Sequence, residues 1–349
     1  FMVGSVVLAA ALVGLVDPIV RLISTPEEAV AGTTAYLTIC FIGIPCITAY
    51  NVLASIFRGM GDSRSPMCFI AAACVVNIGL DFFFMGTLRL GPAGAALGTT
   101  LSQAVSVLLA LCVILKRKSI RLSKSDFCPR KATMKDILSI GLPVAAQDGF
   151  IQVSFMLITI MANQRGLTDA AAVGIVEKII SFLFLVPSSM LSTVSALGAQ
   201  NIGAGKYDRV DKILRYAIAI GVGFGAVMAL LMQFIAPSMM RPFTSDEAVV
   251  LAGAAYIRSY IFDCLFAGIQ FSFSGYFCAW GRSGLSFLHN TLSILLVRVP
   301  GAWLACRFFP QTLVPMGLAP ACGSLFSSIV CVLLYRWMKR QNKPTGDKD

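Results

Sequence analysis

The sequence is poor in charge. Only 13% of its 349 residues are Asp, Glu, Lys or Arg, about half of the fraction found in ordinary soluble domains. Hydrophobic residues make up 57%, and the mean hydropathy is +0.81. A chain with so few charges cannot cover the surface of a soluble globular protein, so soluble enzymes and soluble binding proteins are excluded. The composition indicates a membrane protein with several spans.

Motifs of membrane-embedded and nucleotide-dependent enzymes are missing too. The chain has no HExxH and no GxSxG, and the lone His289 has no metal-ligand partner at local spacing. We interpret His289 as a buried or interfacial histidine with satisfied hydrogen bonds, and a proton relay is the alternative. The stretch GAQNIGAGKYDRV lacks the Gly and the Ser or Thr that a phosphate-binding loop requires. We therefore predict no enzyme activity and no cofactor, and an intramembrane enzyme remains a remote alternative.

Long hydrophobic runs are what the sequence does contain. A helix needs about 20 mainly apolar residues to cross a bilayer, and alternating strands of the kind found in outer-membrane barrels are absent from the pattern. We therefore predict an all-α polytopic membrane protein with ten spans. These spans are residues 1–22, 33–57, 66–87, 92–115, 138–162, 170–197, 212–240, 249–279, 284–309 and 314–337.

The net charge of +11 follows the loops between these spans. Basic residues gather in alternate loops, above all in residues 116–135, 206–215 and 336–343. Because loops rich in Lys and Arg stay on the cytoplasmic side of a membrane, we expect these loops and the C-terminus to be cytoplasmic. This topology explains the charge without nucleic acid as a partner. We expect a monomer in the lipid bilayer of the plasma membrane, most simply a bacterial inner membrane.

The two halves of the chain resemble each other weakly at an offset of about 220 residues, as internal repeats of secondary transporters often do. Arg21 falls on Arg241, Tyr36 on Tyr256, and Gly61-Asp62-Ser63 on Gly281-Arg282-Ser283. We predict an N-terminal bundle of four helices (1–115), a cytoplasmic linker (116–137), a C-terminal bundle of six helices (138–337) and a cytoplasmic tail (338–349). Because the second copy has two more spans, we expect an N-terminally incomplete form of a twelve-span protein that lacks roughly 85 to 100 residues.

Two polar residues interrupt the third predicted span. Asn77 and Asp81 lie four residues apart in CFIAAACVVNIGLDFFFMG, which places them on one face of a helix. A charged Asp at the centre of a bilayer costs about 2.5 to 3.5 kcal/mol even on mild scales, so such a residue usually faces a bundle interior or a cavity and has a function. The alternative is that Asp81 pairs permanently with Asn77 or with a donor on a neighbouring helix and only packs the bundle. The second half has Val297 and Gly301 at the matching positions, so the fold does not require the polar pair twice.

Several motifs occur in a characteristic order. RGMGDSRSP follows one span, NIGLD lies on the next, GAALGTT opens the following span, and GLP and GAQNIGAGKYDRVDKIL come later. Together they resemble the multidrug and toxic compound extrusion (MATE) family of secondary transporters over essentially the whole chain. The resemblance implies two six-helix bundles flanking a central cavity. It also implies export of small organic compounds, mostly cationic or amphipathic, in exchange for H⁺ or Na⁺ as the coupling ion.

The resemblance further implies a cation site and a substrate pocket in the N-terminal bundle. Asp81, Asn77 and Thr99 match the acid, amide and hydroxyl of the family's cation site, and such oxygen donors suit Na⁺, while a buried carboxyl can take up H⁺ instead. We predict no other metal site. Tyr36 and Asn51 match the family's pocket, together with Asp81, and the alternatives are an interface aromatic and an interhelical hydrogen bond.

The C-terminal half departs from one branch of the family, whose acids fall here on Ile151 and near Ala267. Asp263 lies one turn before Ala267, and we predict that it contacts substrate. Pairing of Asp263 with Arg258 or Arg298 is the alternative. A lipid-linked oligosaccharide flippase of the same superfamily is the alternative function. It would need several arginines for pyrophosphate, and only Arg258 and Arg298 are candidates.

Overall fold

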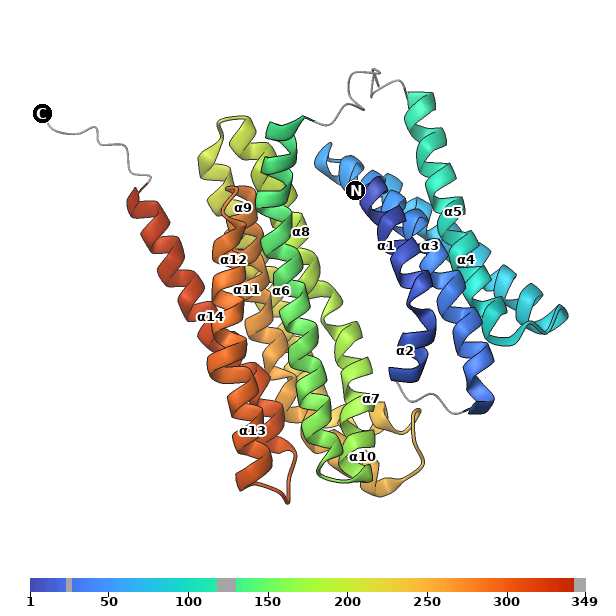
Figure 1. The fold of residues 1–349 in the computed structure, drawn as a ribbon. Coiled ribbons are helices and arrows are strands. Elements are labelled where there is room, and N and C mark those ends of the chain that lie inside the picture. Colours follow the sequence, from blue (N-terminus) through green and yellow to red (C-terminus); the bar gives the residue numbers. More distant parts are fainter. Residues whose placement is uncertain (23–26, 118–129, 342–349) are drawn as a thin grey trace, which may run out of the picture. The chain divides into compact units, whose positions relative to one another are not determined.

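The computed structural model describes residues 1–22, 27–117 and 130–341, and in these residues the chain is helical without any strand. The chain forms two compact units, Phe1–Cys128 and Pro129–Asp349 (Figure 1). Most of the predicted linker, at residues 118–129, lies outside the described residues, as does most of the predicted tail, at residues 342–349. The two units are therefore considered one at a time.

The N-terminal unit is built around α5. Its elements are α1 (Met2–Gly14), α2 (Val16–Leu22), α3 (Glu27–Gly59), α4 (Arg64–Asp81), the π-helix η1 (Phe82–Thr87) and α5 (Gly91–Arg117). α5 packs along both α3 and α4. The rings of Phe57 on α3 and Phe69 on α4 meet edge to face at 5.5 Å in the core of the unit. The Ser106 hydroxyl of α5 donates to the Phe69 carbonyl at 3.2 Å, which ties α5 to α4.

The structure differs from the ten predicted spans at residues 1–22. This stretch forms two short helices that meet at Leu15, and the described residues contain nine helices long and apolar enough to cross a membrane. Pro18 explains the break. It has no N–H to donate to the carbonyl of Gly14, four residues earlier, and its ring clashes with that carbonyl.

The C-terminal unit contains α6 to α14 and one π-helix. The elements are α6 (Lys131–Asn163), α7 (Leu167–Leu183), α8 (Leu185–Gly203), α9 (Tyr207–Met240), α10 (Glu247–Tyr260), α11 (Phe262–Ala279), α12 (Ser283–Ser293), η3 (Ile294–Arg298), α13 (Val299–Phe308) and α14 (Val314–Gln341). α6 starts at Lys131, so residues 131–137 are helical, whereas the sequence predicted a linker there. Two predicted spans are broken, α7 from α8 at Phe184 and α10 from α11 at Ile261.

α11 lies at the centre of this unit, packed against α8, α9 and α14. Its contact with α9 depends on glycine, because Gly221 of α9 meets the backbone of Gly268. One turn further along α9, a Cβ added to Gly225 would lie 2.5 Å from Cα of Leu265. Small residues at such crossings let the backbones of membrane helices approach closely. This contact fixes the position of α11, which carries Asp263.

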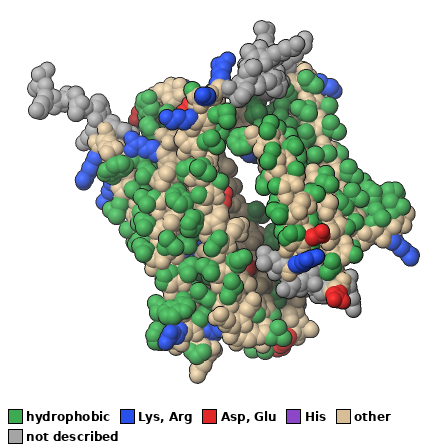
Figure 2. All heavy atoms as spheres, in the orientation of Figure 1, with side chains coloured by type: hydrophobic (Ala, Val, Ile, Leu, Met, Phe, Trp, Pro, Cys, Tyr) green, Lys and Arg blue, Asp and Glu red, His purple; other side chains and the backbone are tan. Residues whose placement is uncertain are grey.

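The outer surface of the C-terminal unit suits a bilayer. Large apolar side chains such as Phe182, Phe234 and Phe308 are exposed on its helices. Figure 2 shows hydrophobic side chains along the sides of these helices, with Lys and Arg gathered toward the helix ends. An apolar flank with charged ends is the pattern expected of helices that cross a membrane.

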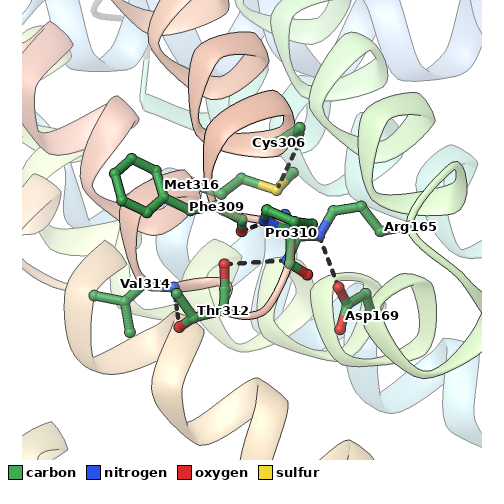
Figure 3. A network of polar contacts seen from close by, with 8 residues as sticks. All are labelled: Arg165, Asp169, Cys306, Phe309, Pro310, Thr312, Val314 and Met316. Carbon is green, nitrogen blue, oxygen red and sulfur yellow. Dashed lines mark hydrogen bonds and ion pairs between the residues drawn. The ribbon is translucent and has the colours of Figure 1, made fainter.

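Arg165, in the turn between α6 and α7, clamps the loop between α13 and α14 (Figure 3). Its Nε pairs with Asp169 at 2.7 Å, and the side chain is only 7% exposed. Nη1 donates to the carbonyl of Phe309 at 3.1 Å, and Nη2 donates to the carbonyls of Pro310 and Thr312 at 3.0 and 3.1 Å. One guanidinium therefore holds two separate loops of the unit together.

We expect the change Arg165→Lys to destabilise the protein by about 2 kcal/mol, because a single ammonium cannot reproduce the planar fork of donors. The measurement is the thermal midpoint of the purified protein in detergent. The same substitution at the exposed Arg215 of α9 is the matched control and should leave the midpoint unchanged. Equal midpoints for the two variants would show that the clamp contributes nothing.

Candidate functional site

Asn77 and Asp81 lie in the last two turns of α4, and their side chains come together against Gly98 of α5. A Cβ added to Gly98 would overlap with Oδ1 of Asp81 and would lie 3.4 Å from Nδ2 of Asn77. Gly98 is itself buried. The structure thus brings the two predicted residues together and adds a third position, whose missing side chain makes room for the carboxylate.

The polar atoms at this contact are not paired. Oδ1 of Asp81 and Nδ2 of Asn77 are both buried, and neither has a hydrogen-bond partner within the described part of the chain. The alternative of a permanent pair between the two side chains is therefore not formed through these atoms. Buried polar atoms are nearly always hydrogen-bonded, and an exception calls for a functional explanation. A carboxylate oxygen without a donor is suited to accept a cation or a proton.

An open pocket of about 320 Å³ borders Asp81, and apart from Asp81 it is lined by Ile78, Phe82, Met85 and Gly86. Of the described residues that line this pocket, Asp81 alone carries a charge. The π-helix η1 begins at the residue after Asp81. Short π-helical turns joined to α-helices occur frequently at functional sites. The pocket gives a small solute a route to the carboxylate.

The side chain of Thr99 forms its hydrogen bond within its own helix, α5. Its hydroxyl is exposed and donates to the carbonyl of Ala95 at 3.0 Å. The residue of α5 that lies against Asp81 is Gly98. The role of Thr99 as a cation ligand therefore stays a prediction. Sequence reasoning missed Gly98. The signal for it was the second glycine of the GAALGTT motif.

Tyr36 and Asn51 both lie on α3 with exposed side chains. Tyr36 is 41% exposed. The Asn51 amide donates to the carbonyl of Ile47 in the same helix at 3.0 Å. This bond does not link two helices, so the predicted interhelical alternative for Asn51 is not formed by it. The substrate-binding roles of the two residues stay predictions.

Asp263 is the predicted site residue of the C-terminal unit, and it is 1% exposed near the start of α11. Of its two candidate partners, Arg258 is exposed, whereas Arg298 of η3 is 8% exposed. Nη2 of Arg298 donates to the Tyr260 hydroxyl at 2.9 Å. The structure therefore favours Arg298 over Arg258 as the charge that faces Asp263, and a contact of Asp263 with substrate stays a prediction.

Sequence reasoning missed Glu177 of α7. This carboxylate is half-buried, accepts a hydrogen bond from Thr159 at 3.0 Å, and interacts electrostatically with Arg298. An acid in the middle of an apolar segment was the available signal. Its link to Arg298 depends on which helices are neighbours, and the local pattern does not contain that information.

Polar residues recur on the inner face of α12. Ser286 donates to Gln147 of α6 at 2.6 Å. His289 is fully buried, with Nε2 at 3.0 Å from the Ser274 hydroxyl and Nδ1 at 2.7 Å from the Ser327 hydroxyl. The interpretation of His289 as a satisfied buried histidine is confirmed. Within the described residues, no group of three or more His, Cys, Asp and Glu side chains is placed to hold a metal ion.

The described residues form helices long enough to cross a membrane, and these helices carry acids with buried, unpaired oxygen atoms. These features define a multi-pass membrane protein with ionisable groups inside its bundles. The family model named MatE matches this chain over residues 1–83 and 143–304. The chain belongs to this family of MATE transporters, as the order of its motifs indicated.

Named relatives agree with this assignment. The chain is 30% identical to the probable multidrug resistance protein YpnP of Bacillus subtilis, over 93% of this chain and 72% of the relative. It is 26% identical to the multidrug export protein MepA of Staphylococcus aureus, over 76% of this chain and 59% of the relative. Both proteins are similar to this chain along most of its length.

Solved structures share the fold. A mutant of the Vibrio cholerae MATE transporter VcmN superposes with a TM-score of 0.91 at 19% identity, over 98% of this chain and 77% of that chain. An outward-facing multidrug resistance MATE transporter of the MOP superfamily superposes with a TM-score of 0.91 at 22% identity, over 99% of this chain and 77% of that chain. The helical arrangement of this chain is therefore that of MATE transporters.

Proposed function

We propose that this protein is a cation-coupled antiporter that exports organic compounds by alternating access, with H⁺ or Na⁺ taken up at Asp81 and Asn77. The observation that carries the proposal is the buried, unpaired Oδ1 of Asp81 on a membrane-length helix. The pocket beside it and the family of the chain support the same conclusion. The names of its relatives, a multidrug resistance protein and a multidrug export protein, support organic compounds as the cargo.

The coupling follows from the contact between α4 and α5. A cation at Oδ1 of Asp81 neutralises a charge that is costly inside a membrane. Because the carboxylate lies directly against Gly98, an ion there also alters how α4 and α5 pack. Ion and cargo must favour different states of the transporter, since a ligand without differential affinity shifts no equilibrium. Tyr36, Asn51, Asp81 and Asp263 are the proposed contacts for the cargo, and a cationic cargo suits the two acids.

The test is the change Asp81→Asn in the full-length protein, reconstituted into vesicles and assayed for dye transport under an imposed pH or Na⁺ gradient. The amide keeps the shape of the side chain but cannot bind an ion by charge. We expect gradient-driven transport to fall at least about tenfold, the effect of losing roughly 1.4 kcal/mol of coupling. A response of the unmodified protein to only one gradient identifies the ion.

The matched control is Asp136→Asn, which removes an exposed acid of α6 and should leave transport unchanged. The thermal midpoint of purified Asp81→Asn in detergent should match that of the unmodified protein, which shows that the variant is folded. Full gradient-driven transport by Asp81→Asn would remove this residue from the coupling mechanism.

A further inference from the structure

The C-terminal unit contains a buried charged centre that the proposed ion site does not include. Asp263 of α11 and Arg298 of η3 are both buried in the unit, and the guanidinium of Arg298 donates a hydrogen bond to the hydroxyl of Tyr260, three residues before Asp263 in the chain. In the described chain, neither carboxylate oxygen of Asp263 has a hydrogen-bond partner, and Nε of Arg298 has none either. A buried anion and a buried cation, each with unused hydrogen-bonding capacity, therefore lie in one interior.

Other groups hold the guanidinium in place. Nη2 of Arg298 donates to the Tyr260 hydroxyl of α10 at 2.9 Å, and Cζ lies 4.7 Å from the centre of the Phe155 ring of α6. A guanidinium over an aromatic face is stabilised by the ring quadrupole. Glu177 of α7 acts on the same guanidinium, but it is only half-buried and already accepts a hydrogen bond from Thr159.

Among the described residues, the positive group in the surroundings of Asp263 is Arg298. Its other polar neighbours are the Tyr260 hydroxyl of α10, the Ser324 hydroxyl of α14 and the adjacent Cys264 of α11, none of which carries a positive charge. A carboxylate buried in this way is stable as an anion only beside a cation. Arg298 is the cation that the described residues provide.

The N-terminal unit has the opposite charge on the equivalent helix. The repeat offset of about 220 residues lays α12, η3 and α13 over α4 and η1, and both stretches include a π-helical turn. The first stretch carries Asp81, whose Oδ1 is unpaired in the described residues. The second lacks the acid and carries Arg298. At this offset Arg298 falls on Ile78, about one turn before Asp81, so the two stretches carry charges of opposite sign at different positions.

We propose that Arg298 is the built-in counter-ion of Asp263, so that the C-terminal unit carries its cation as a side chain while the N-terminal unit takes its cation from solution. This inference rests on the proposed uptake of an ion at Asp81. Arg298 is then a positioning residue that sets how many coupling ions the transporter binds. Without Arg298, Asp263 has to bind a proton or an alkali cation of its own, because an unpaired buried charge is too costly.

The test compares Arg298→Gln, Asp263→Asn and the double variant in the full-length protein in vesicles. The readout is the dependence of dye export on Na⁺ concentration and on pH. Arg298→Gln should lower export at least about tenfold at the ion concentration that half-saturates the unmodified protein, and the ion dependence should become steeper. The double variant should recover the original steepness of the ion dependence, because it removes the unpaired charge; the level of export is not its readout, since Asp263 is also a proposed cargo contact.

Two results would contradict the proposal that Arg298 is the counter-ion of Asp263. An ion dependence as steep in the double variant as in Arg298→Gln, or an unchanged ion dependence in Arg298→Gln, would overturn the counter-ion role. If Arg298→Gln does not fold, Arg298→Lys provides the readout, since it keeps the charge and should keep the original steepness; a steeper dependence there would also contradict the proposal. Asp81→Asn separates the two hypotheses, because intact coupling in that variant refutes uptake at Asp81 while rescue by the double variant still supports the pair.

Discussion

Gly98→Ala is expected to abolish gradient-driven transport while the protein remains folded. The added methyl group would overlap with Oδ1 of Asp81, and the end of that side chain can turn away, so α4 and α5 keep their contact. The carboxylate would then leave the position beside Asn77 where we propose that the ion binds. We expect a loss of at least about tenfold in ion-driven dye export, equal to the loss in Asp81→Asn. Vesicle assays with an imposed pH or Na⁺ gradient measure it.

Gly79→Ala is the matched control for this prediction. Gly79 lies on α4 between Asn77 and Asp81, and a Cβ added there meets nothing within 4 Å. The control makes the same chemical change one helix away and should preserve transport. It should be neutral or slightly stabilising, because alanine is favoured over glycine within a helix by roughly 0.5–1 kcal/mol. Equal transport by the two alanine variants would contradict the assignment of the ion position.

The second large effect is expected for Gly225→Ala on α9. A Cβ at this position would lie 2.5 Å from Cα and 2.8 Å from the backbone nitrogen of Leu265. Backbone atoms cannot rotate out of the way, so α9 and α11 have to move apart. We expect a loss of stability of about 3 kcal/mol, at the upper end of the usual cost of overpacking. Thermal unfolding of the purified protein in detergent measures it.

Gly223→Ala is the control on the same helix, two residues away. Gly223 is exposed and an added Cβ there meets nothing within 4 Å, so the thermal midpoint should not fall. Because α11 carries Asp263, Gly225→Ala should reduce transport as well. An unchanged midpoint for Gly225→Ala would mean that the close approach of α9 and α11 does not stabilise this unit.

Part of this arrangement could be predicted from local patterns. The spacing of Asn77 and Asp81 placed them on one helical face, and the structure brings them together at Gly98. Long apolar runs gave most of the membrane-length helices, because a span is a local property of composition. The charge of residues 116–135 marked the region where the two compact units divide.

The remaining features depend on packing that local patterns do not contain. Thr99 and Gly98 are neighbours in sequence, but one residue turns the direction of a side chain by about 100° around a helix. The rotation of α5 against α4 decides which of the two meets Asp81. In the same way, Arg298 and Glu177 come into range of each other only because of how α7 and η3 are placed within the C-terminal unit.

The polar bonds of α6 have a consequence for motion. Ser283 at the start of α12 donates to the carbonyl of Ser139 at 3.1 Å, and Ser286 donates to Gln147 at 2.6 Å. At the far end of α6, Arg165 holds the loop that follows α13. The two membrane segments are thus joined near both ends and in between, so we expect them to move together. We expect bending within the C-terminal unit to occur instead where α7 meets α8, at Phe184, and where α10 meets α11, at Ile261.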